Sequence, residues 1–237
     1  MSDDLQARFL PRFLLTARSR LGRARSLLDG GDATALADEL HALAGEAKML
    51  DLRKIAEDAI QGEAAARAWS NGADGSRAAS ASRLEALSAA VALLASAPRR
   101  RPSGRHVTGA SKGKSRPKIL VVDDSEIVCD SVTNMLEPRG YQIISLTSLF
   151  AFTQTLTTER PDLVLVDVSM PALDGDKLIH FSRKHDHVSS VMVLFSTRNK
   201  DELSRLAAQC GAAGYIQKTG DAERLQREVE AFLHPAR

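Results

Sequence analysis

Apolar positions in the first 97 residues recur at helical spacing, and β-branched residues are few. Leu14, Leu21 and Leu28 repeat every seven residues, and the sequence DGGD at 29–32 ends that pattern. Pro11 is expected at the start of this helix, since proline fits a first helical turn and not a helix interior. Short connections favour an antiparallel bundle. Further helices are predicted at about 33–50, 52–69 and 83–96, with a loop at 70–82.

The second half alternates short apolar runs with amphipathic stretches, which is the pattern of repeated strand–helix units. Five such units predict an α/β domain with a doubly wound, five-stranded parallel sheet. Functional side chains are then expected just past the carboxyl ends of the strands. The strands are predicted at 118–122, 141–145, 162–166, 190–195 and 213–217. A turn and helix follow the first strand at 123–140, and helices follow the others at 150–158, 175–184, 200–210 and 221–233.

A basic segment separates the two patterns. Residues 98–117, PRRRPSGRHVTGASKGKSRP, contain seven Lys or Arg and no acidic residue, whereas the whole chain has a net charge of only +2. The segment is also rich in Pro, Gly and Ser, which is typical of a solvated, flexible linker. We therefore expect an all-α domain at 1–97 and an α/β domain at 118–237.

The composition also limits the setting of the protein. We find no apolar run that we expect to span a bilayer, and the start, MSDDLQARFL, lacks the order of a secretory signal. Cys129 and Cys210 have no metal or redox spacing. These features predict a cytoplasmic protein with no membrane partner.

His41 is the first candidate for chemistry, within ELHALAGEAKML at 39–50. It lies about 140° from the middle of the leucine stripe on its helix, so the pattern predicts an imidazole that points to solvent. Gly45 and the alanines at 37 and 44 share its face, so a partner could approach closely, and Lys48 could steady an anion. The alternative is an exposed histidine of no special role.

HALAGEA resembles the signature of histidine-containing phosphotransfer (HPt) domains, roughly His-x-Leu-Lys-Gly-Ser/Ala-Ala. Ile55, Ala59 and Glu63 fall where that family has apolar, small and acidic residues. The resemblance implies that His41 holds phosphate as a phosphoramidate and that Glu63 binds the other ring nitrogen and fixes its tautomer. Three positions depart from the family pattern and bear on partner affinity more than on chemistry: Ala44 replaces a basic residue, Glu46 a small one and Asp51 a common glycine.

Carboxylates gather at the strand ends of the second domain. Asp123 and Asp124 follow the first strand, Asp167 follows the third, and Lys218 follows the fifth. Converging carboxylates repel one another unless a cation joins them, and Mg²⁺ prefers oxygen ligands. Asp123-Asp124 alone could also be a helix-capping turn, but that explanation leaves the other strand ends unexplained.

This set resembles the receiver domain of response regulators, through VVDDS, LVLVDVSMPALDG, LFSTRNK and GYIQKTG. The family usually has Lys-Pro, often with a cis bond, where this chain has Lys218-Thr219, so we expect this loop to be trans. The resemblance implies Asp167 as phosphoacceptor, Asp123, Asp124 and the Ser169 carbonyl as Mg²⁺ ligands, Lys218 as the phosphoryl partner, Ser196 as the switch hydroxyl and Tyr215 as the switch aromatic.

Together the two resemblances predict a phosphorelay protein. We expect its partners to be a histidine kinase or other receiver domains, and a downstream protein that binds the face formed by 200–210, 213–217 and 221–233. The sequence shows no ATP-binding kinase motif, so we do not expect kinase activity. One alternative keeps an active receiver and makes the bundle a docking or dimerisation module. Another uses the basic linker to bind DNA, although no DNA-reading motif is visible and we consider nucleic acid an improbable partner.

Overall fold

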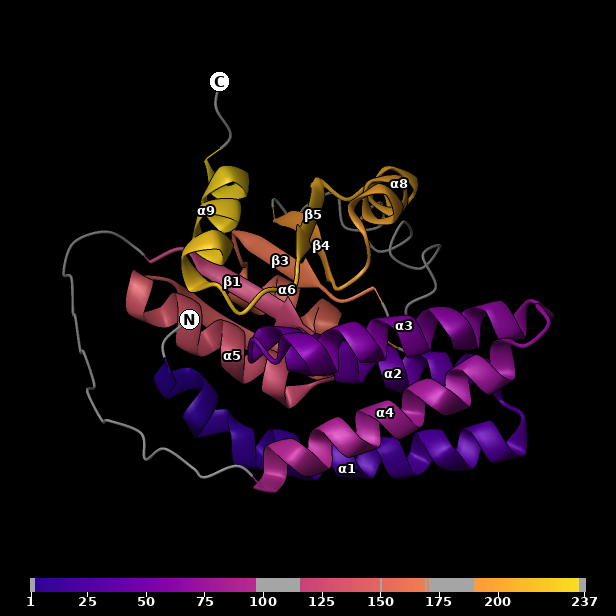
Figure 1. Ribbon diagram of the computed structural model, residues 1–237. Coiled ribbons are helices and arrows are strands. Elements are labelled where there is room, and N and C mark those ends of the chain that lie inside the picture. The colour runs from indigo at the N-terminus through magenta and orange to yellow at the C-terminus, as the bar shows by residue number, and fades with distance from the viewer. Residues whose placement is uncertain (1–2, 97–115, 150, 169, 171–189, 235–237) are drawn as a thin grey trace. The chain divides into compact units, whose positions relative to one another are not determined.

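The computed structural model describes residues 3–96, 116–149, 151–168, 170 and 190–234 (Figure 1). The chain divides into two compact units, Met1–Gly104 and Arg105–Arg237. All but the last two residues of the expected linker, 98–117, lie outside the described residues, as does the helix expected at 175–184. Each unit is described separately below.

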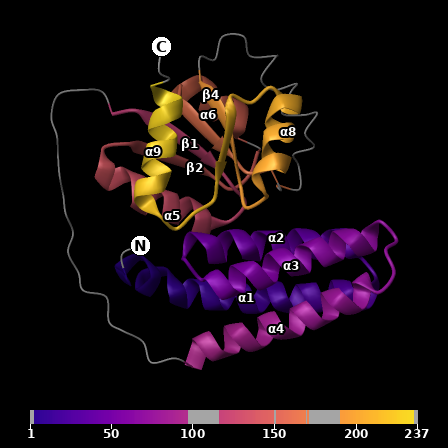
Figure 2. The ribbon, with the colours of Figure 1, turned by 45° about the horizontal axis from the view of Figure 1, so that its top comes forward.

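The first unit is a bundle of four helices (Figure 2). They are α1 (Asp3–Gly30), α2 (Ala33–Met49), α3 (Arg53–Ser70) and α4 (Ser76–Ser96). Each helix packs on the next along the chain, and α4 packs back on α1. The core contains Phe13, Leu36, Leu40, Leu43 and Leu87, none more than 1% exposed. Apolar stripes with short connections therefore produce the expected all-α fold.

The bundle differs from the expected elements in two places. Helix α1 is continuous through Pro11, and the buried Phe13, Leu14 and Ala17 that follow hold it against its neighbours despite the missing amide hydrogen. Helix α4 begins at Ser76, not near residue 83, so the connection from α3 is much shorter than predicted. Its first turns are rich in alanine, a strong helix former, and the buried Ser80 hydroxyl donates to the Ser76 carbonyl oxygen at 2.9 Å.

Helix α4 is also long and apolar enough to cross a membrane by length and composition, with a mean hydropathy of 1.3 over its best 18-residue window. Among the residues that the structure describes, it is the one helix with this property. The sequence pattern had led us to expect none. Its buried residues Leu84, Leu87 and Val91 lie on the side that packs on α1 and α3, as in the core helix of a bundle.

The second unit is built on a five-stranded parallel sheet, which confirms the predicted α/β fold. The strands are β1 (Lys118–Val122), β2 (Gln142–Leu146), β3 (Leu163–Val166), β4 (Val191–Ser196) and β5 (Gly214–Gln217), in the order β2-β1-β3-β4-β5. The central strand β3 is buried at every position, because helices cover both faces of the sheet. The described helices are α5 (Glu126–Leu136), α6 (Phe152–Glu159), α8 (Lys200–Cys210) and α9 (Ala222–Leu233), with a short 3₁₀ turn, η1, at Glu137–Arg139.

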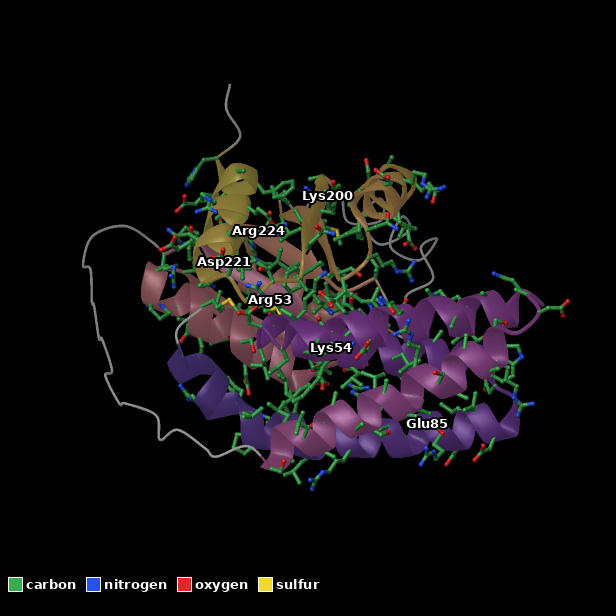
Figure 3. The ribbon with its side chains drawn as sticks, in the orientation of Figure 1. Arg53, Lys54, Glu85, Lys200, Asp221 and Arg224 are labelled. Atoms are coloured by element: carbon green, nitrogen blue, oxygen red, sulfur yellow. The ribbon has the colours of Figure 1, made fainter. Side chains whose placement is uncertain are left out.

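Side-chain caps start three of these helices close to the strand ends. Ser125 caps α5, Asn199 caps α8 and Asp221 caps α9, each accepting a hydrogen bond from a backbone amide of the first turn. Figure 3 labels Asp221 beside Arg224, whose amide nitrogen lies 3.0 Å from the Asp221 Oδ1. The caps keep the loops between strands and helices short, so the residues in those loops lie at the carboxyl edge of the sheet.

Candidate functional site

Three carboxylates meet at the carboxyl edge of the sheet. Asp123 and Asp124 follow β1, and Asp167 follows β3, which is hydrogen-bonded to β1. One oxygen from each lies within 4.8 Å of the others. Asp123 and Asp167 are 0% and 2% exposed, and Asp124 is exposed. The parallel register of β1 and β3 therefore brings together residues that are more than forty positions apart in sequence.

Lys218 extends from the end of β5 to the same carboxylates. Its Nζ lies 2.7 Å from Oδ2 of Asp123 and 3.2 Å from Oδ1 of Asp167, and the side chain is 3% exposed. Burial alone would lower the pKa of Lys218, but the charges of Asp123 and Asp167 outweigh it and raise that pKa above its usual range. Burial raises the pKa of Asp123 against the opposing charge of Lys218, and the like charge of Asp167 raises it further.

The donor set suits a hard cation. The Lys218 ammonium contacts Asp123 and Asp167 of the three carboxylates, so the cluster keeps a net negative charge at a largely buried point. All three carboxylates offer oxygen atoms as ligands. Mg²⁺ binds such groups while keeping several waters. Ser169, whose carbonyl the resemblance adds to the ligands, lies outside the described residues.

The two predicted switch residues, Ser196 and Tyr215, lie on the strands next to Lys218. The Lys218 amide donates to the Ser196 carbonyl oxygen at 2.9 Å, and the Ser196 hydroxyl, buried, lies 3.4 Å from the amide nitrogen of Arg198. Tyr215 pairs with Leu194 across β4 and β5 and is half-buried against the core. The described backbone contains no cis peptide, so the Lys218–Thr219 bond is trans, as expected.

Gln217 was not singled out by the sequence. Its side-chain amide donates to the Arg198 carbonyl oxygen at 2.8 Å, so the loop after β4 is tied to β5 by a side chain as well as by the backbone. The sequence did contain a signal for this role, because Gln217 is a polar residue that ends an otherwise apolar strand directly before Lys218.

The second cluster of polar groups lies in the bundle, between α2 and α3. Nδ1 of His41 is 2.9 Å from Oε2 of Glu63, and His41 Nε2 has no hydrogen-bond partner among the described residues. Burial would raise the pKa of Glu63, but its hydrogen bonds and charge interactions with His41 and Arg67 outweigh burial and leave that pKa below its ordinary value. The two ring nitrogens are therefore in different environments.

The ring of His41 is 1% exposed, whereas the helical pattern had predicted an imidazole that points to solvent. The prediction assumed that one stripe of the helix is buried, but 11 of the 17 residues of α2 are buried, including Gly45 and the alanines at 37 and 44. The contact with Glu63 also turns the imidazole toward α3 instead of solvent. Lys48 is half-buried in the last turn of α2.

Two departures from the HPt pattern have structural explanations. Glu46 is 1% exposed and pairs with Arg20 of α1, with Oε1 3.0 Å from Nη2, so it joins two helices. Asp51 has a positive φ of 55°, a backbone conformation that favours glycine, which accounts for the common glycine there.

Sequence reasoning did not identify Arg67 and Asp38 as neighbours of the histidine. Arg67 Nε lies 2.9 Å from Oε1 of Glu63, and Arg67 Nη2 lies 3.8 Å from Oδ1 of Asp38 on α2. The spacing of Glu63 and Arg67, four residues apart on one helix, was the signal that could have indicated their pairing.

Comparisons with known proteins match each half of the chain to a protein family. The family model of the response regulator receiver domain matches residues 119–230, and that of the Hpt domain matches residues 8–97. PilH of Pseudomonas aeruginosa is 31% identical over 117 residues, which cover 49% of this chain and 97% of that protein. The transcriptional regulatory protein YxdJ of Bacillus subtilis is 33% identical over 119 residues, but the chain spans only about half of its length, 51%.

A solved receiver domain from Bermanella marisrubri is 26% identical, covering 49% of this chain and 98% of that one, with a TM-score of 0.44. The sequence matches in the two halves of the chain, and the polar clusters found in each, lead to one assignment. The chain belongs to the two-component phosphorelay proteins, as an Hpt domain followed by a response regulator receiver domain.

Proposed function

We propose that the protein carries a phosphoryl group at two positions, on Nε2 of His41 and on a carboxylate oxygen of Asp167, and that transfer at Asp167 depends on Mg²⁺. The observation that carries the proposal is the cluster of Asp123, Asp124 and Asp167 within 4.8 Å, with the Lys218 ammonium 3.2 Å from Asp167. Family membership supports the general role, and the residue assignments are our inference from the geometry.

At Asp167, the carboxylate attacks the phosphorus of a phosphohistidine or an acyl phosphate. The donor's P–N or P–O bond breaks, and its electron pair stays on the leaving atom. Phosphoryl transfer requires alignment and charge neutralisation more than covalent help. Asp123, Asp124 and Asp167 would hold Mg²⁺, which adds positive charge beside the phosphoryl oxygens. Lys218 is near enough to bind one of those oxygens once Asp167 is phosphorylated.

At His41, Glu63 Oε2 accepts a hydrogen bond from Nδ1–H, which leaves the lone pair for attack on Nε2. Attack by Nε2 on an aspartyl phosphate gives a phosphoramidate and releases the aspartate carboxylate. The reverse reaction returns the phosphoryl group to a receiver. Gly45 and Lys48 would help a partner domain to approach and steady its anion.

We infer that phosphorylated Asp167 attracts the Ser196 hydroxyl and that Tyr215 then turns inward. This movement changes the face formed by α8, β5 and α9, where a downstream protein would bind. The phosphate comes from a histidine kinase or from another receiver, and we place the protein in the cytoplasm. These partners are inferred from the two modules.

Labelling of the full chain tests the proposal. Acetyl phosphate with Mg²⁺ should label the wild-type protein and the His41→Gln variant, whereas Asp167→Asn should remain unlabelled. A phosphorylated cognate receiver should then label His41 in the Asp167→Asn variant. Loss of the second reaction alone would reduce the bundle to a docking or dimerisation module, and equal acetyl phosphate labelling of Asp167→Asn would refute the assignment of Asp167.

A further inference from the structure

Four charged or ionisable side chains connect α2 and α3 around the histidine. Asp38 and His41 are three residues apart on α2, and Glu63 and Arg67 are four residues apart on α3, so each pair shares a helix face. Contacts join them in the order Asp38, Arg67, Glu63, His41, at 3.8, 2.9 and 2.9 Å.

The two oxygens of Glu63 contact different partners. Oε2 faces Nδ1 of His41, and Oε1 accepts a hydrogen bond from Nε of Arg67. A carboxylate held at one oxygen only can rotate about its last bond and offer either oxygen, or neither, to the imidazole. The bond to Arg67 opposes that rotation, because it fixes the second oxygen on the side away from the ring.

Arg67 itself is held from the opposite helix. Asp38, on the helix that carries His41, lies 3.8 Å from Nη2, so the guanidinium bridges the same two helices as the imidazole–carboxylate pair. An ordinary ion pair between residues four apart on one helix lies within that helix, whereas Arg67 also contacts Asp38 on the neighbouring helix. Arg67 is 40% exposed, so the network contributes little to overall stability, and its effect is on geometry.

We propose that Arg67 is a positioning residue for phosphate transfer at His41. It holds Glu63 so that the Nδ1–H tautomer persists and Nε2 remains the nucleophile, and Asp38 steadies Arg67. The inference rests on the proposed role of His41 and extends it to a residue that does not touch the reacting atoms. Some residues do not touch the reacting atoms but hydrogen-bond a ligand or base and fix its orientation. Removing such a residue commonly lowers affinity or rate by about 10- to 100-fold.

The test uses the full chain in the Asp167→Asn background, with potassium phosphoramidate as a small phosphate donor and ¹⁵N-histidine labelling for NMR. In the parent protein we expect His41 to show an unprotonated Nε2. In Arg67→Gln we expect signals of both tautomers and about tenfold slower labelling of His41. Arg67→Lys, which restores one charged donor, should recover part of both properties. Asp38→Ala should produce a smaller change in the same direction.

Lys54→Gln is the matched control. Lys54, labelled in Figure 3, pairs with Asp58 four residues further along α3 at 2.7 Å. The substitution removes this ion pair and leaves the contacts of Glu63 in place. Its tautomer and labelling rate should equal those of the parent. If Arg67→Gln and Asp38→Ala also retain the parental tautomer and rate, Arg67 is only a surface partner and the inference fails. If the parent shows the Nδ1–H tautomer but never gains phosphate, the proposed function of His41 fails, while the tautomers still decide the role of Arg67.

Discussion

Nδ1 of His41 lies 2.9 Å from Oε2 of Glu63, and this contact places the two ring nitrogens in different environments. The nitrogen that donates to the carboxylate cannot attack phosphorus, and the other keeps its lone pair. A carboxylate beside Nδ1 favours the tautomer in which Nδ1 carries the hydrogen.

The phosphoryl group on His41 should therefore sit on Nε2. We expect acid-labile, base-stable phosphate, with phosphorus–nitrogen coupling in NMR to Nε2 and none to Nδ1. In Glu63→Gln, the amide can donate to Nδ1 as well as accept from it, so the wrong tautomer becomes populated and labelling should slow by roughly tenfold or more. Phosphate found on Nδ1 would contradict this arrangement.

The same carboxylate should make bundle stability depend on acid. The pKa of Glu63 is lower in the folded protein than its ordinary value of 4.5, so the folded state binds fewer protons than the unfolded chain. The stabilisation is complete above pH 4.5 and is lost as pH falls through the folded pKa. The difference in unfolding free energy between wild type and Glu63→Gln should be constant above about pH 5 and should shrink as the pH falls below about 4.5.

Trp69, the single tryptophan of the chain, can report this unfolding because it lies on α3 with Arg77 5.1 Å from its ring centre. Urea titrations followed by its fluorescence give the free energies at each pH. A difference that stays constant below about pH 4.5 as well would mean that Glu63 has the same pKa in both states.

Lys218 should matter for transfer more than for metal binding. Its Nζ lies 2.7 Å from Oδ2 of Asp123. The ammonium group therefore competes with a metal ion for this carboxylate oxygen. Lys218→Met should gain phosphate from acetyl phosphate about 100-fold more slowly, because a fixed positive charge near the phosphoryl oxygens is lost. Calorimetry should find Mg²⁺ binding unchanged or tighter. The control is Lys200→Met, which changes an exposed lysine at the start of α8 (Figure 3). If Lys218→Met lost Mg²⁺ binding together with phosphate labelling, Lys218 would instead organise the metal site.

Gly214 in β5 should tolerate no side chain. A Cβ at this position would lie 2.7 Å from Cζ of Phe232 on α9, so the ring or the strand would have to move. Gly214→Ala should destabilise the receiver domain by about 1–3 kcal/mol, measured by urea unfolding and circular dichroism. Gly211→Asn is the control, because Gly211 faces open space and asparagine tolerates its φ of +69°. Equal stability of the two variants would disprove the predicted clash.

The sequence by itself determined the fold class and pointed to Asp123, Asp167, Lys218, His41 and Glu63 as candidate residues. Val164 and its neighbours in 162–166 predicted a buried parallel strand because a strand covered on both faces must be apolar throughout. Parallel topology then places the residues after β1, β3 and β5 at one edge, so Asp123, Asp167 and Lys218 could be grouped before any distance was known. The HALAGEA motif likewise identified His41.

Only the tertiary structure decided how the histidine is held. Helical periodicity describes one helix at a time, so it could not foresee that Nδ1 of His41 lies 2.9 Å from Glu63 on α3. The contact between Arg67 and Asp38 also depends on the packing of α2 on α3, which no spacing within a single helix specifies. Sequence spacing therefore determined which groups share a helix or a sheet edge, whereas packing between helices decided which atoms meet.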